Sequence, residues 1–458
     1  MTTNNWAPDS WTTKPRKQDV TYPDPQAFEE VLQRLGSLPP LVCPEEVVKL
    51  RAQLRKVALG EAVLLQGGDC AELFEYCNDD TIRNKLKVLL QMSLVLIWGT
   101  GLPVVRIARM AGQYAKPRSS PYETVNGTQV MSFRGDNVNG YELDQRTPDP
   151  QRLLSAYFHS ATTLNYVRAL LQAGFADLHH PLSWNLDHVR EDKRRGEYQA
   201  IVTQLIQTLE FMRTIGAAGD DLASLNTADI FMSHEGLILE YEQALTRHQH
   251  ARGTDGPAWY NLGAHFLWIG DRTRQLDGAH IEYFRGIQNP IGIKCGPTLE
   301  AAELVRVLDI VNPDREVGKV TLISRYGANK IQDHLPAHIE AVRAAGHVVV
   351  WACDPMHGNT ETSPTGVKTR NFDNIMAEIK ASANIHSSLG SRLNGIHLEL
   401  TGDSVTECVG GSMELTHGDL AQNYTTFCDP RLNNKQSLDI AFLVASYYQE
   451  TRAKDTAE

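Results

Sequence analysis

The stretch His347-Val-Val-Val-Trp-Ala-Cys-Asp-Pro-Met-His-Gly-Asn-Thr360 decides the fold and locates the chemistry of this chain. Its first part, Val348–Ala352, has no polar break, as a strand that is covered on both faces requires. Its second part brings a thiol, a carboxylate and an imidazole directly after that strand, in Cys353, Asp354 and His357. A buried strand that runs into such a loop is typical of a parallel sheet with functional groups at the carboxyl ends of its strands.

The same pattern recurs along the chain. Other apolar runs lead to cationic or metal-type side chains, namely Cys70, Arg109, Asp271, Arg272, Lys294, Arg325 and Glu399. Buried strands are predicted at residues 62–67, 103–109, 228–233, 265–270, 290–295, 319–325, 347–353 and 395–401. Because (β/α)8 barrels build their active sites at the carboxyl ends of eight such strands, we expect an α/β fold of that type.

Additional elements precede and interrupt the predicted barrel. Residues 1–45 are rich in Pro, Trp and charge and form an N-terminal extension with a short helical pattern at 25–35, and residues 46–458 form the catalytic barrel. The interval between Arg109 and Ile230 is far too long for one βα unit. It contains a polar loop at 115–149, a helix from Asp149-Pro150 to Leu171, and an inserted helical element at about 187–215.

Helix ends are predicted from acidic, Gly and Pro residues. Asp79-Asp80 opens a helix whose apolar residues continue to Trp98, and Gly99 is expected to stop it. Pro336 stands where the first residue of another helix should be, because a missing N–H costs nothing there.

The composition restricts the class of protein. The chain has 458 residues, of which 42% are hydrophobic and 22% charged, as in a globular protein. Its formal net charge of −11 argues against a nucleic-acid or membrane-surface partner. No secretory signal is visible, and polar residues, Gly and Pro interrupt the apolar segment 88–105, which excludes a membrane span. Seven dispersed cysteines fit reduced thiols in the cytoplasm, where we expect an enzyme.

One group of residues has the chemistry of a metal site. It comprises a thiol, an imidazole and two carboxylates, in Cys70, His357, Glu399 and Asp429. Such a mixed set suits Mn, Fe, Co or Zn rather than Ca or Mg. The spacing gives no signature, however, because the residues are far apart in the sequence. Taken singly, Cys70 is more often a small buried side chain, and His357 a solvated loop residue.

A second group is cationic. It comprises Arg109, Lys116, Arg118, Arg272, Lys294 and Arg325. Arginine binds carboxylate and phosphate oxygens in a two-pronged fashion, and lysine supplies a compact charge. A surface ion pair is the commoner role of any one such residue, but a charge at the end of an apolar strand must face a partner or a ligand. Together the two groups indicate a phosphorylated substrate that is handled beside a divalent ion.

Several motifs resemble those of the type II 3-deoxy-D-arabino-heptulosonate 7-phosphate synthases. They follow the family order from about residue 40 to residue 447, which is nearly the whole chain. The motifs lie at Gln66–Glu72, Arg106–Ser119, Trp268–His280, Cys353–Thr360, His397–Gly402, Thr406–Cys408 and Cys428–Asn433.

The resemblance implies a (β/α)8 barrel that condenses phosphoenolpyruvate with erythrose 4-phosphate, the first step of the shikimate pathway. It implies that Cys70, His357, Glu399 and Asp429 bind a divalent metal, for which we expect Mn²⁺ or Co²⁺. It places phosphoenolpyruvate against Arg109, Lys116, Arg272, Lys294 and Arg325. It places erythrose phosphate against Lys116-Pro117-Arg118-Ser119, with Asp354 beside the metal and the sugar. Among these residues we assign catalysis to Lys116, Arg272, Lys294 and His357.

Two further points follow from the resemblance. This chain has Asp271 where the family usually has Glu, so the carboxylate is retracted by one methylene and a direct contact with substrate is in doubt. The extension 1–45 and the element at 187–215 resemble parts that longer members use for assembly and feedback inhibition. We therefore expect a homo-oligomer, a dimer or tetramer, with an aromatic amino acid as effector. The alternative is that both elements only contribute packing.

Two other functions remain open from the sequence. One is a condensing enzyme of the same chemistry that uses another sugar phosphate, such as an arabinose phosphate. The other is a non-catalytic scaffold or partner of an aromatic-pathway enzyme. The presence of all four metal-type residues argues against this second alternative.

Overall fold

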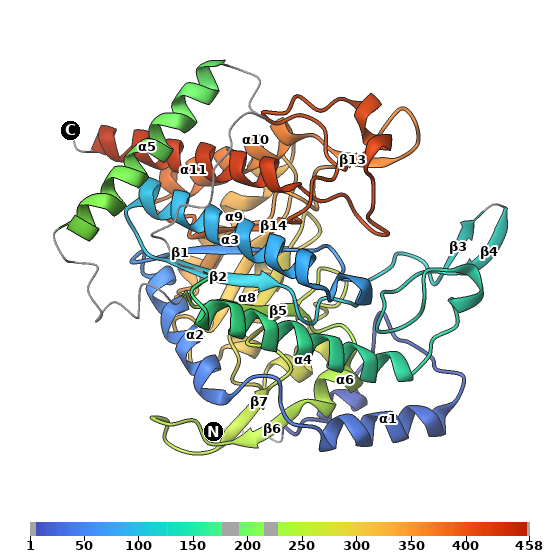
Figure 1. Ribbon diagram of the computed structural model, residues 1–458. Coiled ribbons are helices and arrows are strands. Elements are labelled where there is room, and N and C mark those ends of the chain that lie inside the picture. The colour runs from blue at the N-terminus through green and yellow to red at the C-terminus, as the bar shows by residue number, and fades with distance from the viewer. Residues whose placement is uncertain (1–5, 126, 176–191, 215–227, 456–458) are drawn as a thin grey trace.

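The computed structural model describes residues 6–125, 127–175, 192–214 and 228–455. Eight strands form a closed barrel in which every neighbouring pair is parallel (Figure 1). The strands succeed one another around the barrel in chain order. They are β1 (Val63–Gly68), β2 (Val104–Arg109), β5 (Phe231–Glu235), β8 (Phe266–Ile269), β9 (Ile291–Cys295), β10 (Val320–Ser324), β11 (Val350–Cys353) and β14 (Gly395–Glu399).

A helix follows each barrel strand, so the fold is the expected (β/α)8 barrel, also called a TIM barrel. The apolar sides of these helices pack on the outward-facing residues of the strands and bury the barrel on its outer face. The helices are α3 (Asp79–Thr100), α4 (Gln151–Gln172), α6 (Leu239–Ala244), α7 (Ala279–Phe284), α8 (Ala301–Val311), α9 (Ile331–Ala344), α10 (Phe372–Ser388) and α11 (Asn434–Asp455).

Helix α2 (Pro44–Ala58) closes the amino end of the barrel. Its Leu50, Leu54 and Val57 are fully buried in one cluster with side chains that fill the barrel interior. It lies against the segment that precedes β14, where Nδ2 of Asn394 donates to the carbonyl of Val57. The barrel is therefore closed at its amino end.

The segment before α2 packs on the barrel side. It contains a 3-10 turn, η1 (Ser10–Thr13), and helix α1 (Pro25–Ser37). Trp11 is buried with residues of the outer core, and its indole N–H donates to Gln243. Of the predicted inserted element at 187–215, helix α5 (Asp192–Thr214) is described, and residues 187–191 and 215 lie outside the described residues.

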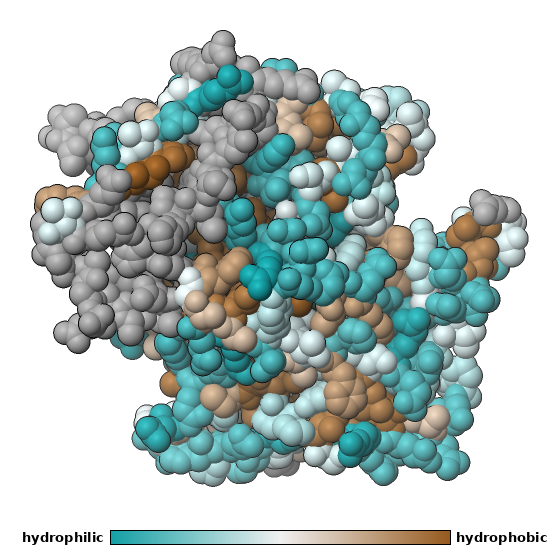
Figure 2. Space-filling view, in the orientation of Figure 1, coloured by the Kyte–Doolittle hydropathy of each residue, from teal (hydrophilic) through white to brown (hydrophobic). Residues whose placement is uncertain are grey.

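The described residues include three antiparallel hairpins, which lie in the loops between barrel strands and helices. They are β3 (Tyr122–Val125) with β4 (Thr128–Met131), β6 (Thr246–Gln249) with β7 (Ala258–Asn261), and β12 (Thr360–Thr362) with β13 (Lys368–Arg370). The β3–β4 hairpin stands away from the body, and Figure 2 shows it at the right of the molecule. It occupies part of the predicted polar loop 115–149, and its Tyr122 and Met131 are exposed.

Two helix ends differ from the prediction. Helix α3 continues through Gly99 to Thr100 and ends on Gly101, whose φ of 67° is left-handed. Gly99 instead allows close packing, because a Cβ there would lie 2.3 Å from the Cβ of Ala445 on α11. Pro336 is inside α9 rather than at its start, since the helix already begins at Ile331. No helix in the described ranges combines the length and the apolar character that a membrane crossing requires.

Candidate active site

The carboxyl ends of the strands open into a cavity of about 600 Å³. Asp354 is buried just behind the wall of the cavity, in contact with Lys294 and His357. The other predicted site residues line the cavity itself, namely Cys70, Arg109, Lys116, Arg118, Ser119, Asp271, Arg272, Lys294, Arg325, His357, Glu399 and Asp429.

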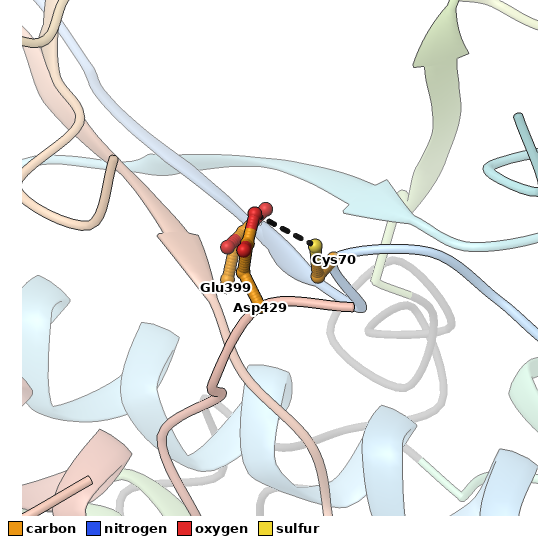
Figure 3. A group of neighbouring side chains, drawn as sticks. All are labelled: Cys70, Glu399 and Asp429. Atoms are coloured by element: carbon orange, nitrogen blue, oxygen red, sulfur yellow. Dashed lines mark hydrogen bonds between the residues drawn. The ribbon is translucent and has the colours of Figure 1, made fainter. Parts of the chain in front are cut away.

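Three of the predicted metal ligands form a compact group. Cys70, which follows β1, Glu399 at the end of β14, and Asp429 in the loop beyond it each place one ligand-type atom within 4.8 Å of the others (Figure 3). Cys70 and Glu399 are buried and Asp429 is partly buried, so two carboxylates and a thiol share one site in the wall of the cavity. Such a donor set fits a divalent transition metal.

His357, the fourth predicted ligand, is adjacent to this group. Its Nε2 lies 3.1 Å from Oε1 of Glu399, and its Nδ1 lies 2.7 Å from Oδ2 of Asp354. A buried carboxylate that holds one ring nitrogen while the other faces a ligand position is the usual support of a metal-binding imidazole. His357 thus lies beside the group of Cys70, Glu399 and Asp429, but it is not among the residues whose ligand-type atoms converge within 4.8 Å.

Lys116 extends into the same group. Its Nζ donates to Sγ of Cys70 at 2.8 Å and to Oδ2 of Asp429 at 2.7 Å. Burial lowers the pKa of Lys116, but the charges of Asp429, Cys70 and Glu399 outweigh burial and hold it well above its ordinary value. The Lys116 ammonium in turn is the largest influence that lowers the pKa of Asp429. This lysine is therefore a permanent cation beside the metal-type group.

Two more cations lie deep in the cavity. Arg109 pairs with Glu399 at 2.9 Å, and Lys294 pairs with the buried carboxylate of Asp354. Both lie over the face of Trp268, with Arg109 Cζ 5.0 Å and Lys294 Nζ 5.9 Å from the ring centroid. Burial lowers the pKa of Lys294 to about 8, although Asp354 opposes this shift. His397 lies between the two cations.

His397 separates these cations as a neutral acceptor. Its Nε2 is within hydrogen-bonding distance of Arg109 Nη1 and of Lys294 Nζ, both of which can only donate. Burial and the two neighbouring cations hold the pKa of His397 well below its ordinary value. The proton of the ring therefore belongs on Nδ1. The uncharged ring of His397 accepts from both Arg109 and Lys294, so these two cations can lie close together and bind the same anion.

Asp271 supports Arg325 rather than facing the cavity alone. Its Oδ2 lies 3.0 Å from Nη1 of Arg325, and its Oδ1 accepts from Nε of Arg274 at 2.9 Å. Arg325 also donates to the carbonyl of His357 at 3.2 Å, which ties the loops after β10 and β11 together. Asp271, which is one methylene shorter than Glu, thus pairs with both Arg325 and Arg274.

The rim of the cavity carries the remaining cations. Arg272 Nη2 donates to Oγ of Ser119 at 3.1 Å, and Arg118 pairs with Glu123 on β3. Arg118 is half-buried, whereas Arg272 and Ser119 belong to the more exposed part of the wall. The deep cations and the rim cations therefore form two layers of positive charge in one cavity.

Several charged residues of the site were not predicted from the sequence, among them Glu235 and Arg370. Glu235 is buried at the end of β5, its Oε1 has no hydrogen-bond partner among the described residues, and burial raises its pKa. Arg370 on β13 lies 2.8 Å from Oε2 of Glu399. A signal existed for Glu235, because β5 ends on a functional residue as the other strands do. The predicted strand 228–233 stopped two residues too early to reveal it. Arg370, in a loop hairpin, carried no such signal.

The fold and the cavity define an enzyme class: a (β/α)8 barrel with a metal-type group and layered cations at the carboxyl ends of its strands. Comparison with known proteins specifies the family. The chain belongs to the Class-II DAHP synthetase family, whose family model matches residues 6–445.

Named relatives span the whole chain. It is 55% identical to the phospho-2-dehydro-3-deoxyheptonate aldolase of Neurospora crassa, over 99% of this chain and 96% of that protein. It is 49% identical to the protein of the same name from Streptomyces coelicolor, over 97% and 98% of the two chains. It is 46% identical to phospho-2-dehydro-3-deoxyheptonate aldolase AroG of Mycolicibacterium smegmatis, over 96% and 94%.

Proposed function

We propose that this chain condenses phosphoenolpyruvate with D-erythrose 4-phosphate and water, giving 3-deoxy-D-arabino-heptulosonate 7-phosphate and inorganic phosphate. Membership in the family supports the reaction. The observation that carries the proposal is a cavity of about 600 Å³ in which one compact metal-type group adjoins two layers of cations. Two anionic substrates and one divalent ion require such an arrangement.

Phosphoenolpyruvate belongs in the deep layer. It carries a carboxylate and a phosphate, and Arg109, Lys294 and Arg325 offer buried or half-buried donors for both. Lys116 and Arg272 extend this set towards the rim. The two buried cations are held in place by Glu399 and Asp354, so little reorganisation is needed when the anion enters.

The aldose phosphate belongs at the rim, against Lys116, Arg118, Ser119 and Arg272, with Asp354 behind the imidazole of His357. C3 of phosphoenolpyruvate then faces the aldehyde carbon and forms the new C–C bond. Water adds at C2, and the C–O bond to phosphate breaks to release inorganic phosphate. No covalent enzyme intermediate is required, so positioning and charge stabilisation by Lys116, Arg272, Lys294 and His357 supply the catalysis.

The metal would be held by Cys70, His357, Glu399 and Asp429. A bound divalent ion supplies Lewis-acid polarisation of a substrate oxygen. The mixture of thiol, imidazole and carboxylates fits a transition metal, and we propose Mn²⁺, with Co²⁺ as a functional substitute. Lys116 lies beside Cys70 and Asp429. From there its ammonium would donate hydrogen bonds to the aldehyde oxygen as negative charge develops on it.

The decisive experiment measures loss of phosphoenolpyruvate and release of phosphate with erythrose 4-phosphate. Full turnover is expected with Mn²⁺ and none after exhaustive chelation, with metal content measured in both samples. Equal turnover in the metal-free sample would refute the metal requirement. Faster turnover with arabinose 5-phosphate would assign a different aldose. No consumption of phosphoenolpyruvate with any aldose phosphate would favour the non-catalytic alternative.

We also propose that the chain works in the cytoplasm as a homo-oligomer, a dimer or tetramer, that an aromatic amino acid inhibits. The N-terminal extension 1–45 and the inserted element at 187–215 are the parts that would serve assembly and inhibition. Sedimentation analysis with and without phenylalanine, tyrosine and tryptophan, combined with the turnover assay, tests both statements. A monomer that none of the three amino acids inhibits would contradict them.

A further inference from the structure

The N-terminal segment reaches the rim of the cavity at Gln18. The side-chain Oε1 of Gln18 accepts from the backbone N–H of Arg118 at 2.8 Å, and its Nε2 donates to the backbone carbonyl of Arg118 at 2.9 Å. One amide side chain thus makes the pair of hydrogen bonds that a neighbouring β-strand would make. The two residues are 100 positions apart in the sequence.

Arg134 completes a closed circuit around the same loop. Its backbone carbonyl accepts from the N–H of Lys116 at 2.8 Å. Its guanidinium donates to the carbonyl of Asp19 at 2.6 Å and to the carbonyl of Gln18. The loop that carries Lys116 and Arg118 is therefore held on one side by the Arg134 backbone and on the other by the Gln18 side chain.

The backbone of Gln18 is held in an uncommon conformation. Its φ of 60° is left-handed, a region that residues other than glycine seldom occupy. Such a conformation persists only where the surroundings fix it. Here the Arg134 guanidinium fixes the Gln18 and Asp19 carbonyls, and the N–H of Ala279 donates to the Pro15 carbonyl at 2.9 Å, which anchors the segment just before.

We propose that Gln18 is a positioning residue for the aldose phosphate, because it fixes the backbone of the loop that carries Lys116, Arg118 and Ser119. The inference rests on the proposed function, in which Lys116, Arg118 and Ser119 bind this phosphate. The side chain of Gln18 bonds to the backbone of Arg118 and not to its guanidinium, which lies on the cavity wall. The deep cations Arg109 and Lys294 have no contact with this circuit, so the effect is specific for the rim substrate.

The test compares Gln18→Met, Gln18→Ala and Gln18→Gly. All three remove both hydrogen bonds, and Gly also fits the left-handed backbone better than the native residue. In all three, the Michaelis constant for erythrose 4-phosphate should rise about tenfold, from two lost hydrogen bonds, while that for phosphoenolpyruvate changes less than about twofold. Gln26→Ala is the matched control, because Gln26 on α1 is exposed and bonds only to Glu30.

Hydrogen exchange provides a readout that does not depend on turnover. The backbone N–H groups of Lys116, Arg118 and Ser119 should exchange faster in the three Gln18 variants than in the wild type or in Gln26→Ala, with thermal stability unchanged. A wild-type Michaelis constant for erythrose 4-phosphate in active Gln18 variants would overturn the inference and leave the reaction intact. A normal constant in Gln18→Gly alone would assign the effect to backbone strain and also overturn it. Absence of turnover in the wild type would instead refute the proposed function, and this subsite with it.

Discussion

The ammonium nitrogen of Lys116 lies 2.8 Å from the sulfur of Cys70, inside the group of side chains that has the chemistry of a metal site. The same nitrogen lies 2.7 Å from Oδ2 of Asp429. A divalent ion held by Cys70 and Asp429 and the Lys116 ammonium are like charges that compete for the same two partners. A metal held by these residues would therefore weaken both contacts of Lys116.

Two variants should consequently distinguish the loss of metal binding from the loss of catalysis. Lys116→Met should bind Mn²⁺ at least as tightly as the wild type, because a competing cation is removed, yet turnover should fall by several orders of magnitude. Cys70→Ala should lose both metal affinity and turnover. Equilibrium dialysis with elemental analysis, together with the phosphate-release assay, measures the two quantities. Weaker metal binding in Lys116→Met would contradict the competition between the two cations.

The reaction should slow in alkaline solution because of Lys294. Its pKa is lowered to about 8 by burial, so the charged form that binds an anion predominates below pH 8 and is lost as the pH rises through this value. The ratio kcat/KM for phosphoenolpyruvate reports the free enzyme and should fall about tenfold per pH unit above that point. The decline in kcat should begin at a higher pH than the decline in kcat/KM, because the bound anion stabilises the charged ammonium of Lys294.

Lys294→Met should remove this alkaline limb. It should also weaken productive binding by roughly 2–5 kcal/mol, since the anion loses a buried cation and Asp354 loses one of its two charged or ring partners. Lys330→Met, at an exposed lysine beside α9, is the control and should keep the wild-type pH profile. An unchanged alkaline limb in Lys294→Met would assign the titration to another group.

Glu378 on α10 should position two loops of the site. Its Oε1 accepts from the backbone N–H groups of Tyr326 and Gly327, and its Oε2 accepts from Nδ2 of Asn359. Tyr326 directly follows Arg325, and Asn359 lies two residues after His357. Glu378→Ala should destabilise the fold by roughly 1–3 kcal/mol for each buried donor left unpaired, measured by thermal or denaturant unfolding.

Glu378→Gln distinguishes the two loops. The Gln oxygen can still accept from Tyr326 and Gly327, but its NH₂ group faces the NH₂ group of Asn359. Metal affinity, which depends on His357, should therefore fall more than affinity for phosphoenolpyruvate, which depends on Arg325. Asp373→Asn on the exposed first turn of α10 should change neither. Equal losses in both affinities would show that Glu378 supports the fold as a whole.

Cys428 directly precedes Asp429, whose Oδ2 lies 3.9 Å from Sγ of Cys70, so Cys70 and Cys428 should form a disulfide when the metal is removed. Two thiols then lose two electrons and two protons to an added oxidant such as hydrogen peroxide. The chelated enzyme should be inactivated, bound metal should protect it by engaging the Cys70 sulfur, and thiol reductant with metal should restore it.

Peptide mapping should reveal a Cys70–Cys428 linkage in the oxidised protein. Cys428→Ser should resist inactivation, whereas Cys77→Ser, at another partly buried cysteine, should behave as the wild type. Two freely alkylatable thiols after complete inactivation would exclude this disulfide without affecting the metal assignment.

The sequence predicted the barrel well because its strands are marked locally. Each is an apolar run that ends on a functional side chain, and hydrophobic periodicity requires no knowledge of distant contacts. Gly99 and Pro336 show where local signals mislead. Gly99 serves packing against Ala445, and helix α9 tolerates Pro336 because its apolar face, from Ile331 to Val342, is buried against the barrel.

The supporting residues of the site could not be predicted in the same way. Gln18, Arg370 and Glu378 act on partners that are brought to them by the closed barrel, and nothing in their neighbours along the chain marks them. Gln18 in particular lies in a segment without regular structure. Its partner is defined only when the extension folds back on the loop after β2, so tertiary structure creates this contact and local sequence does not announce it.

The plug formed by Leu50, Leu54 and Val57 of α2 has a kinetic consequence. These side chains fill the amino end of the barrel. A substrate therefore reaches the buried Arg109 and Lys294 from the carboxyl end, past the rim where Arg118 lies. A molecule seated at the rim blocks the way to the deep layer. With the substrates placed as proposed above, we expect phosphoenolpyruvate to bind first and the aldose phosphate second, an order that the shape of the barrel would impose on them.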